Sequence, residues 1–261
     1  MREFLTGESS GIGAALARHY CAAGATLGLA ARRRDRLAAL AAELPGAHSW
    51  YVLDVADAAA LQAAAADFIA RWGCPDLVVA NAGISVGTLA EEAADLPAFH
   101  RVFATNVFGM AQTFQPFIAA MKARGSGCLA GIASVAGIRG LPGAGAYSAS
   151  KAAAIAYLEA LRVELRGSGV KVVTIAPGYV ATPMTAANPY PMPFLLTADE
   201  AARRFARAIE RGASYRVIPW QMGVVAKLLR LLPNPAFDAL FARASRKPRG
   251  LKKSDIPDQR L

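Results

Sequence analysis

Tyr147 and Lys151 are the two residues whose chemistry and spacing most directly suggest catalysis. They lie four positions apart at the start of a predicted helix, so their side chains share one face and can interact. A free tyrosine has a pKa of about 10, and a neighbouring ammonium group favours the tyrosinate and lowers that pKa. The pair therefore predicts a tyrosine hydroxyl that acts as a general acid or base. Taken alone, the same spacing also fits a solvated helix face.

A serine after the fifth predicted strand adds a second polar group near that pair. Ser134 follows residues 128–132, at the sheet edge where a reacting carbonyl group should lie. A hydroxyl there can hydrogen-bond the substrate oxygen while the charge on that oxygen changes. Ser134 therefore favours the catalytic interpretation of Tyr147 and Lys151 over the solvated face.

The glycine-rich segment 6–13 lies between the first predicted strand and the first predicted helix, with the spacing G-x-x-x-G-x-G. Glycines let the backbone approach a diphosphate, and a helix N-terminus offers free N–H groups and the positive end of a dipole. A plain glycine turn is the alternative, but the position between a strand and a helix favours dinucleotide binding. We expect the diphosphate to contact Gly7, Ser9, Ser10, Gly11, Ile12 and Gly13.

The second predicted strand ends at Ala31 and is followed by Arg32 and Arg33, with no acidic residue at that place. An acid there would bind the ribose 2′-hydroxyl of NAD(H), whereas an arginine suits the 2′-phosphate of NADP(H). Glu8 opposes this preference, because a carboxylate would repel phosphates unless it turned outward or paired with Arg32 or Arg33. We expect NADP(H), with NAD(H) as the alternative cofactor and a solvated basic turn as the alternative without one.

Short apolar runs alternate along the chain with segments of helical periodicity. The predicted strands cover residues 2–5, 26–31, 49–53, 77–80, 128–132, 170–176 and 215–219. The predicted helices cover residues 12–23, 34–44, 58–72, 99–123, 148–166 and 198–211. This alternation predicts an α/β fold, a doubly wound parallel sheet with helices on both faces. Ligands of such folds bind beyond the carboxyl ends of the strands.

Two further motifs lie at such strand ends. Asp54 and Val55 follow the third predicted strand, where an adenine ring would lie. The fourth predicted strand is followed by Asn81, Ala82 and Gly83. An ordinary Asx or glycine turn is the alternative for each motif taken alone.

Taken in order, the motifs make residues 1–219 resemble the classical short-chain dehydrogenases/reductases. The matching positions are residues 6–13, Asp54, 81–83, Asn106, Ser134, the Tyr147-x-x-x-Lys151 pair and the Pro-Gly-Tyr-Val-Ala-Thr run at 177–182. The resemblance implies a Rossmann fold with a seven-stranded parallel sheet. It also implies an oxidoreductase that interconverts an alcohol and a ketone or aldehyde by hydride transfer. Extended-type epimerases and enoyl reductases fit less well, because their glycine or tyrosine–lysine spacing differs.

The resemblance implies a role for each residue of a catalytic tetrad. Tyr147 would exchange a proton with the substrate oxygen, Lys151 would lower the pKa of Tyr147 and bind the nicotinamide ribose, and Ser134 would hold the carbonyl group. Asn106 would anchor a water molecule that relays protons to Lys151. The nicotinamide end of the cofactor would contact Pro177, Gly178, Val180 and Thr182. Ser10 stands where many NADP-preferring members carry a basic residue, which favours NAD(H).

The substrate end is expected in residues 183–197, which form a mobile lid in the family. Three prolines within residues 189–193 make this segment stiff and non-helical. Its methionines and aromatic residues suggest an apolar or lipid-like substrate. A packed lid without specific substrate contacts is the alternative.

Residues 220–261 form a C-terminal segment after the catalytic domain, which we place at residues 1–219. Residues 220–232 and 237–243 show amphipathic patterns, and residues 246–253 are predicted to be a disordered basic tail. The helices could pack on the domain or on a partner subunit. Alternatively, residues 221–261 could make a peripheral contact with an anionic membrane. The resemblance implies a homodimer or homotetramer through helices around 106–122 and 148–166.

The net charge of +10 comes almost entirely from residues 200–261, which hold 14 Lys/Arg and 5 Asp/Glu. Because the remaining chain is nearly neutral, we expect no nucleic-acid partner. Three widely spaced cysteines predict neither a disulfide framework nor a metal site, and they fit a reducing compartment. No signal-peptide pattern or spanning segment is evident, so we expect a cytoplasmic protein, membrane-associated if the C-terminal segment contacts lipid.

Two competing functions stay open beside an NADP(H)-dependent alcohol dehydrogenase or carbonyl reductase with a small-molecule substrate. One is a non-catalytic protein of the same fold that binds or senses a dinucleotide. The other is a membrane-surface interaction protein, which depends on the C-terminal segment alone. The presence of Ser134, Tyr147 and Lys151 together favours the enzyme.

Overall fold

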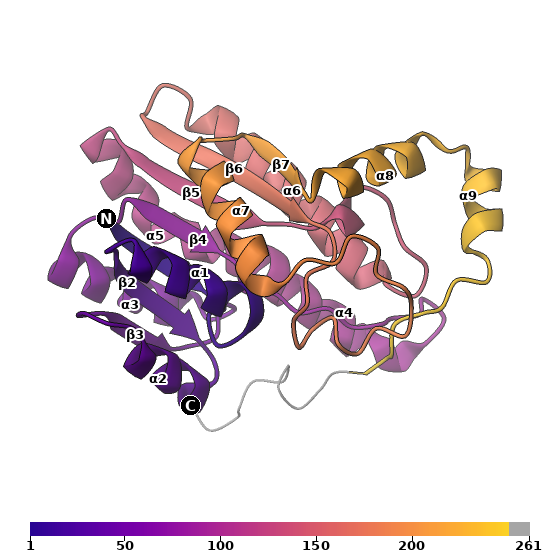
Figure 1. Cartoon of the computed structure of the whole chain (residues 1–261), viewed down its shortest axis with the longest axis horizontal. Coiled ribbons are helices and arrows are strands. Elements are labelled where there is room, and N and C mark those ends of the chain that lie inside the picture. Colours follow the sequence, from indigo (N-terminus) through magenta and orange to yellow (C-terminus); the bar gives the residue numbers. More distant parts are fainter. Residues whose placement is uncertain (251–261) are drawn as a thin grey trace.

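Seven strands form one parallel sheet in the order β3-β2-β1-β4-β5-β6-β7 in the computed structural model, which describes residues 1–250 (Figure 1). The strands are β1 (Arg2–Thr6), β2 (Thr26–Ala31), β3 (Ser49–Val52), β4 (Leu77–Ala80), β5 (Gly127–Ile132), β6 (Val170–Pro177) and β7 (Tyr215–Ile218). Neighbouring strands pair in parallel throughout the sheet. The predicted doubly wound sheet is therefore confirmed, and the strand ends differ from the prediction by at most one residue.

Helices cover both faces of this sheet. One face is covered by α1 (Gly11–Ala22), α2 (Arg34–Glu43) and α7 (Ala198–Glu210). The other face is covered by α3 (Ala58–Trp72), α5 (Gly109–Arg124) and α6 (Gly145–Glu164). Successive strand residues point to opposite faces, so Leu5 of β1 packs in the first layer and Phe4 in the second. Both layers are apolar, which buries the sheet on both sides.

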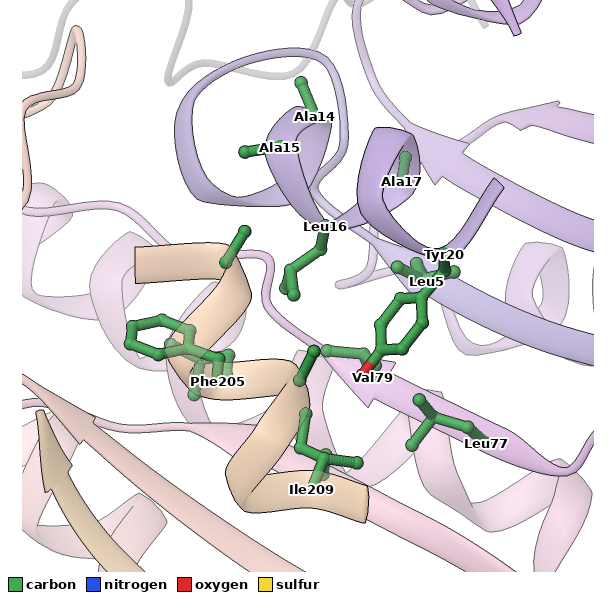
Figure 2. Close-up of a cluster of buried hydrophobic side chains, with 14 of the residues drawn as sticks. Leu5, Ala14, Ala15, Leu16, Ala17, Tyr20, Leu77, Val79, Phe205 and Ile209 are labelled. Carbon is green, nitrogen blue, oxygen red and sulfur yellow. The ribbon is translucent and has the colours of Figure 1, made fainter. Parts of the chain in front are cut away.

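The first layer is closed by the packing of α1 against α7. Figure 2 shows Leu16 and Tyr20 of α1 together with Phe205 and Ile209 of α7 over the strand residues. Leu16 and Phe205 are fully buried, and Ile209 is nearly so. The core thus holds α1, which follows the glycine-rich segment, in a defined position on the sheet.

The strand order reverses between β1 and β4, which are hydrogen-bonded neighbours. From β1 the chain moves outward to β2 and β3, and from β4 it moves outward to β5, β6 and β7. The loops that leave the carboxyl ends of β1 and β4 therefore diverge and leave a crevice between them. Open α/β sheets bind their ligands at this position.

The predicted helix 99–123 is a longer and less regular run. It consists of α4 (Leu96–Phe103), a π-helical stretch (Ala104–Phe108) and α5, preceded by a short 3₁₀ turn (Ala93–Asp95). The π-helical stretch contains Asn106 and precedes Gly109, where a Cβ atom would lie 2.6 Å from Val55. The predicted continuous helix missed this stretch, because a π-helical turn inserts a residue and interrupts the 3.6-residue repeat on which the prediction depends.

The C-terminal helices α8 (Trp220–Leu231) and α9 (Asn234–Phe241) follow β7. The second helix was expected at 237–243 but begins at Asn234, because a proline is well tolerated in the first turn of a helix. Arg139, in the loop after a 3₁₀ turn (Val135–Gly137), donates hydrogen bonds to the carbonyl oxygens of Leu229 and Leu232. Its guanidinium group also lies 3.9 Å from the ring centroid of Phe237. Within residues 1–250, no helix is both long and apolar enough to cross a bilayer.

Candidate active site

The glycine-rich loop is shaped by contacts that leave no room for side chains. Gly7 has a φ of +85°, and a Cβ atom there would lie 2.7 Å from the Cα atom of Ala82. A Cβ atom on Gly13 would lie 2.7 Å from the Nδ2 atom of Asn81, and one on Gly11 would lie 3.0 Å from the methyl group of Thr182. The loop therefore sits tightly against the ends of β4 and β6, as a cradle for a diphosphate requires.

Asn81 and Thr6 join the ends of β1 and β4. The Asn81 Nδ2 atom donates to the carbonyl oxygens of Thr6 and Gly7, at 3.2 and 3.3 Å. The Thr6 hydroxyl donates to the carbonyl oxygen of Val79 and accepts from the backbone N–H of Ala82, both at 3.4 Å. These bonds satisfy backbone groups that the diverging loops would otherwise leave unpaired.

Arg33 ties the end of β2 to the glycine-rich loop. Its guanidinium group donates to the hydroxyl of Ser9 at 2.7 and 3.0 Å and to the hydroxyl of Ser10 at 2.7 Å. Arg32, Arg33, Ser9 and Ser10 all line the same cavity. Two guanidinium groups therefore stand where a 2′-phosphate on the adenosine ribose would lie.

Glu8 behaves differently from the sequence expectation. It neither turns outward nor pairs with Arg32 or Arg33, because its side chain is fully buried and its carboxyl oxygens lack a hydrogen-bond partner in the described chain. Burial raises the pKa of Glu8 well above its usual range, and the nearby backbone of Glu8 and Ala30, too poorly aligned for a full hydrogen bond, offsets only part of this rise. The raised pKa favours the neutral carboxyl group, and this form weakens the expected repulsion of phosphates.

Asp54 is turned away from the cavity. Its carboxylate accepts from the backbone N–H of Ala56 at 3.0 Å and forms a salt bridge with Arg101. Leu53 and Val55, on either side of it, line the cavity. Asp54 therefore orders the loop after β3, and an adenine ring would meet its two apolar neighbours.

Asn106 is buried, and both polar atoms of its side chain form hydrogen bonds. Its Oδ1 atom accepts from the backbone N–H of Ile84 at 2.8 Å, and its Nδ2 atom donates to the Ile84 carbonyl oxygen and the Ser150 hydroxyl, both at 3.0 Å. The Ser150 hydroxyl donates in turn to the carbonyl oxygen of Tyr147 at 2.8 Å. Asn106 thus joins the π-helical stretch to the segment after β4 and to the first turn of α6.

Ser134, Tyr147 and Lys151 meet at the carboxyl ends of β5 and β6. Ser134 follows β5, and its hydroxyl oxygen accepts from the backbone N–H of Ala136 at 3.2 Å. The Lys151 Nζ atom donates to the carbonyl oxygen of Ile132 at 2.8 Å and lies 6.0 Å from the Tyr147 ring centroid. α6 begins at Gly145, three residues before the predicted start, so Tyr147 lies in its first turn.

Burial dominates the titration of this group. It raises the pKa of Tyr147, and the nearby Ser134 hydroxyl offsets part of that rise. Burial also lowers the pKa of Lys151 to about 8. Burial therefore has a larger effect on the pKa of Tyr147 than the expected lowering by Lys151. Neither group keeps the hydration that stabilises its charged form.

One cavity of about 550 Å³ connects these parts. Of the residues expected at the site, the cavity is lined by Gly7, Ser9, Ser10, Gly11, Ile12, Arg32, Arg33, Val55, Asn81, Ala82, Gly83, Ser134, Tyr147, Lys151, Pro177, Gly178, Val180 and Thr182. Gly13, Asp54 and Asn106 lie behind this lining and support it. Residues 1–250 contain no group of three or more His, Cys, Asp or Glu side chains placed to hold a metal ion.

The cavity also has walls that the sequence did not predict. Ile84, Ser85 and Val86 line it directly after the Asn81–Gly83 motif. Their position beyond the end of β4 is a signal that could have identified them. Residues 247–250 line it as well, and nothing in their local sequence indicates this.

The C-terminal residues 247–250 were expected in a disordered tail, and the structure instead places them on the body of the protein. The Lys247 ammonium group donates to the Ser85 hydroxyl at 2.9 Å, and the Pro248 carbonyl oxygen accepts from the backbone N–H of Gly87 at 3.0 Å. Arg249 forms salt bridges with Asp95 at 2.8 Å and Glu92 at 2.9 Å. Paired acids and backbone hydrogen bonds hold this segment, whereas Lys252 and Lys253 lie outside the described residues.

The expected lid has a closed base. The backbone N–H of Ala181 donates to the Leu196 carbonyl oxygen at 2.8 Å, and that of Leu196 donates to the Tyr179 carbonyl oxygen at 3.0 Å. Between these positions the chain forms turns and contributes Pro183, Met184, Thr185 and Ala187 to the cavity. The lid therefore faces residues 247–250 across the substrate end.

The fold and this cavity agree with a sequence match to a known family. The family model described as short chain dehydrogenase matches residues 4–191. The chain belongs to the short-chain dehydrogenase family. An uncharacterized oxidoreductase from Myxococcus xanthus is 40% identical over 242 residues, which is 92% of this chain and 95% of the relative. The family is one of nucleotide-dependent oxidoreductases.

Two solved structures of the family extend the comparison to cofactors. An alcohol dehydrogenase from Thermococcus sibiricus, complexed with 5-hydroxy-NADP, has a TM-score of 0.74 and 29% identity, over 83% of this chain and 95% of that one. A 3-ketoacyl-(acyl-carrier-protein) reductase from Brucella melitensis, complexed with NADH, has a TM-score of 0.77 and 25% identity, over 83% and 96%. Proteins of this fold thus hold either nicotinamide dinucleotide.

Proposed function

We propose that this protein is an NADP(H)-dependent alcohol dehydrogenase or carbonyl reductase, in which Tyr147 exchanges a proton with the substrate oxygen. The observation that supports this most strongly is a single cavity with a glycine cradle and two arginines at one end. Ser134, Tyr147 and Lys151 lie at the other end. A nicotinamide dinucleotide fits this layout, because the positions of Gly7, Gly11 and Gly13 exclude a Cβ atom where a diphosphate must approach.

The residues at the diphosphate end bind and orient the cofactor. Backbone N–H groups at the start of α1 face the diphosphate, and Arg32 and Arg33 contact the 2′-phosphate. Pro177, Gly178, Val180 and Thr182 surround the nicotinamide, and Lys151 donates to its ribose. When bound, NADP(H) supplies or accepts the hydride.

The residues at the other end handle the substrate oxygen. The Ser134 oxygen already accepts from Ala136, so its own proton remains available to the substrate oxygen or to Tyr147. The Tyr147 hydroxyl gives its proton to that oxygen during reduction and takes it back during oxidation. Because burial raises the pKa of Tyr147, its protonated state is favoured, which suits a proton donor in carbonyl reduction.

Asn106 and Lys151 form the inner end of a proton path. A Cβ atom on Gly83 would lie 3.2 Å from the Asn106 Oδ1 atom and 3.5 Å from the Lys151 Nζ atom. The two polar atoms therefore face one position beside the glycine. Oδ1 retains one lone pair after its bond with Ile84, so a water molecule between Oδ1 and Nζ supports the relay proposed for Asn106.

We assign the substrate an apolar body. Met184 and Pro183 of the lid and Ile84 and Val86 beyond β4 line the same cavity as Ser134, Tyr147 and Lys151. Apolar lining with a few convergent polar groups is the usual composition of a small-molecule site. A panel of apolar ketones and aldehydes, each tested with and without a carboxylate, would reveal whether the nearby Lys247 and Arg249 select a charged end.

The decisive test is Tyr147→Phe, which keeps the ring and removes the proton. We expect kcat for NADPH-linked reduction to fall by about 10²–10⁴-fold, while NADPH binding, followed by nicotinamide fluorescence, stays unchanged. Retained turnover in the variant would contradict the mechanism. A wild-type protein that binds NADPH but turns over no carbonyl or alcohol would instead favour a non-catalytic dinucleotide-binding protein.

Cofactor choice is tested separately by titrating the protein with NADPH and with NADH. We expect tighter NADPH binding, and we expect Arg32→Gln to weaken NADPH at least tenfold while changing NADH little. Arg36→Gln, an exposed arginine in the first turn of α2, is the matched control. Equal affinities for both cofactors in the wild-type protein would contradict the assignment of NADP(H).

A second candidate function is contact with an anionic membrane surface through α8. Trp220, Val224, Leu228 and Leu231 lie on one side of this helix and are 69, 47, 61 and 79% exposed. Lys227 and Arg230 lie on the same helix, which has no acidic residue. An apolar helix face beside cationic side chains matches an anionic lipid surface.

The membrane contact is tested with vesicles of phosphatidylcholine and phosphatidylglycerol. We expect the wild-type protein to pellet with them and Leu228→Glu to remain in solution. Trp50→Glu, at the opposite edge strand β3, is the control for a lost exposed apolar side chain. Equal pelleting of both variants would contradict the proposal.

We also propose a homodimer or homotetramer in which α5 and α6 meet their copies. Phe108 at the end of the π-helical stretch is 59% exposed, and Val163 on α6 is 61% exposed. Exposed apolar side chains on α6 and directly before α5 suit a protein interface. Sedimentation velocity should show an oligomer, and Val163→Arg should shift it toward the monomer. A monomeric wild-type protein would contradict the assignment.

A further inference from the structure

Four arginine side chains surround a small cavity at the edge of the sheet. Arg204, Arg207 and Arg211 come from α7, and Arg216 comes from β7, the last strand of the sheet. The cavity has a volume of about 180 Å³ and shares no lining residue with the active-site cavity. We call it the arginine hollow.

The convergence of these side chains follows from the spacing of the residues. Positions 204, 207 and 211 are three and four apart, so they lie along one face of α7. Arg216 lies two residues before Ile218 and points to the same face of β7, where Ile218 packs into the core beneath α7. Ala208, Ala213 and Ile218 provide an apolar floor between the guanidinium groups.

The hollow carries more positive charge than the protein itself balances. Arg204 pairs with Glu200 at 2.6 Å, and Glu200 also pairs with Arg203. Within the described chain, Arg207, Arg211 and Arg216 make no salt bridge, and all three are exposed. Like charges that converge on one cavity repel each other, and a bound anion would convert this repulsion into attraction.

We propose that the arginine hollow binds a compact, multiply charged oxyanion, namely a phosphate or diphosphate group. Guanidinium groups donate pairs of parallel hydrogen bonds that match phosphate oxygens, and a phosphate offers enough oxygens for several of them at once. The volume equals that of about six water molecules at about 30 Å³ each. This space accommodates one or two phosphate groups but not a whole dinucleotide. The phosphate can come from a free metabolite or from a lipid headgroup.

Calorimetric titration with inorganic diphosphate tests the site directly. Saturating NADPH must be present, because the glycine-rich loop is itself expected to bind phosphates. We expect one diphosphate per chain, with an affinity that falls as salt rises. The double variant Arg207→Gln/Arg211→Gln should weaken binding at least tenfold, and Arg203→Gln on the same helix is the matched control.

Each outcome is decisive. Absence of binding to the wild-type protein, or equal binding by the control and the double variant, would overturn the proposal. Arg216→Gln provides an independent check, because it removes charge from β7 without changing α7. The thermal midpoints of the variants show whether they remain folded, and the NADPH affinity should be unchanged because the two cavities are separate.

Vesicle pelleting distinguishes the two sources of phosphate. This test uses Leu228→Glu as the background, because that change removes the contact proposed for α8 with anionic lipid. If the ligand is a lipid headgroup, this protein should pellet with phosphatidylcholine vesicles that contain phosphatidic acid but not with phosphatidylcholine alone. In that case diphosphate should release it, and the double variant should stay in solution. If calorimetry is positive and these vesicles make no difference, the site takes a free phosphate compound.

Discussion

The two ends of the active-site cavity are built in different ways. At the cofactor end, the glycine-rich loop meets its neighbours through backbone contacts, so that even a Cβ atom would clash. At the substrate end, residues 247–250 are held mainly by the long side chains of Lys247 and Arg249, with one backbone hydrogen bond from Gly87 to Pro248. Backbone contacts of this kind do not adjust, whereas long polar side chains can exchange partners. The cofactor end is therefore the rigid part and the substrate end the adjustable part.

The same contrast holds for electrostatics. Glu8 at the cofactor end is fully buried, and burial favours its neutral carboxyl form by raising its pKa. Asp95 at the substrate end accepts from Arg249 and from the backbone N–H of Leu89, and these bonds lower the pKa of its carboxyl group. Removing a charged partner should therefore matter more at the substrate end than at the cofactor end.

The largest effect is expected from Gly13→Ala at the rigid end. The new methyl group would lie 2.5 Å from the carbonyl oxygen of Gly7 and 2.7 Å from the Asn81 Nδ2 atom. Neither group can move without disturbing the loop after β1 or the end of β4, because Asn81 donates to Thr6 and Gly7. Overpacking of this kind costs about 1–3 kcal/mol. If the bound state carries this cost, NADPH affinity should fall by roughly fivefold to 150-fold. Fluorescence titration measures this loss.

Gly145→Ala is the matched control for that change. Gly145 begins α6 beside the catalytic residues, but a Cβ atom there would meet nothing within 4 Å. Its NADPH affinity should equal that of the wild-type protein. Equal NADPH affinities for Gly13→Ala and Gly145→Ala would contradict the rigidity that we assign to the cofactor end.

A smaller effect is expected from Arg249→Gln at the adjustable end. Loss of the salt bridges with Asp95 and Glu92 should release residues 247–250 and raise KM for the carbonyl substrate several-fold. The effect is limited because the Arg249 pairs are partly exposed and screened by solvent. NADPH affinity should not change, and the Gly87 amide should exchange its hydrogen faster because it donates to Pro248.

Two further variants sharpen the interpretation of Arg249→Gln. Gly87→Ala attacks the same contact from the body of the protein, because its Cβ atom would collide with the carbonyl oxygen of Lys247. It should raise KM in the same way. Arg243→Gln removes an exposed arginine before this segment and should leave KM unchanged. An unchanged KM in both the Arg249 and Gly87 variants would remove residues 247–250 from the substrate site.

The smallest effect at neutral pH is expected from Glu8→Gln. Folding raises the pKa of Glu8. The neutral carboxyl group therefore makes its full contribution to the stability of the folded protein below the pKa of the unfolded chain, about 4.5. This contribution is lost as the pH rises through the raised pKa, and the NADPH affinity should then fall in the wild-type protein. Glu8→Gln should bind NADPH normally at pH 7 and flatten the alkaline decline. Parallel pH profiles for both proteins would contradict this account.

The fold was predictable because its signals are local. Apolar runs and helical periodicity identified every strand of the sheet and the helices that cover it, and Tyr147 and Lys151 share a face because of their spacing alone. The features that the sequence did not predict have physical causes that a short stretch of neighbouring residues does not contain. Asn106 occupies a π-helical stretch, and residues 247–250 are held by partners more than 150 positions away, as in the 162-residue separation of Lys247 and Ser85.

By itself, the sequence determined the order of strands and helices, the glycine-rich loop and the polar residues that follow the strands. Periodicity, glycine conformation and strand-end position depend on neighbours in the chain. Only the tertiary structure decided that Glu8 is buried with a raised pKa, that Asp54 turns away, that residues 247–250 line the cavity and that four arginines converge beside β7. Desolvation, side-chain pairing and shared surfaces arise when residues distant in sequence pack together, so no local pattern contains them.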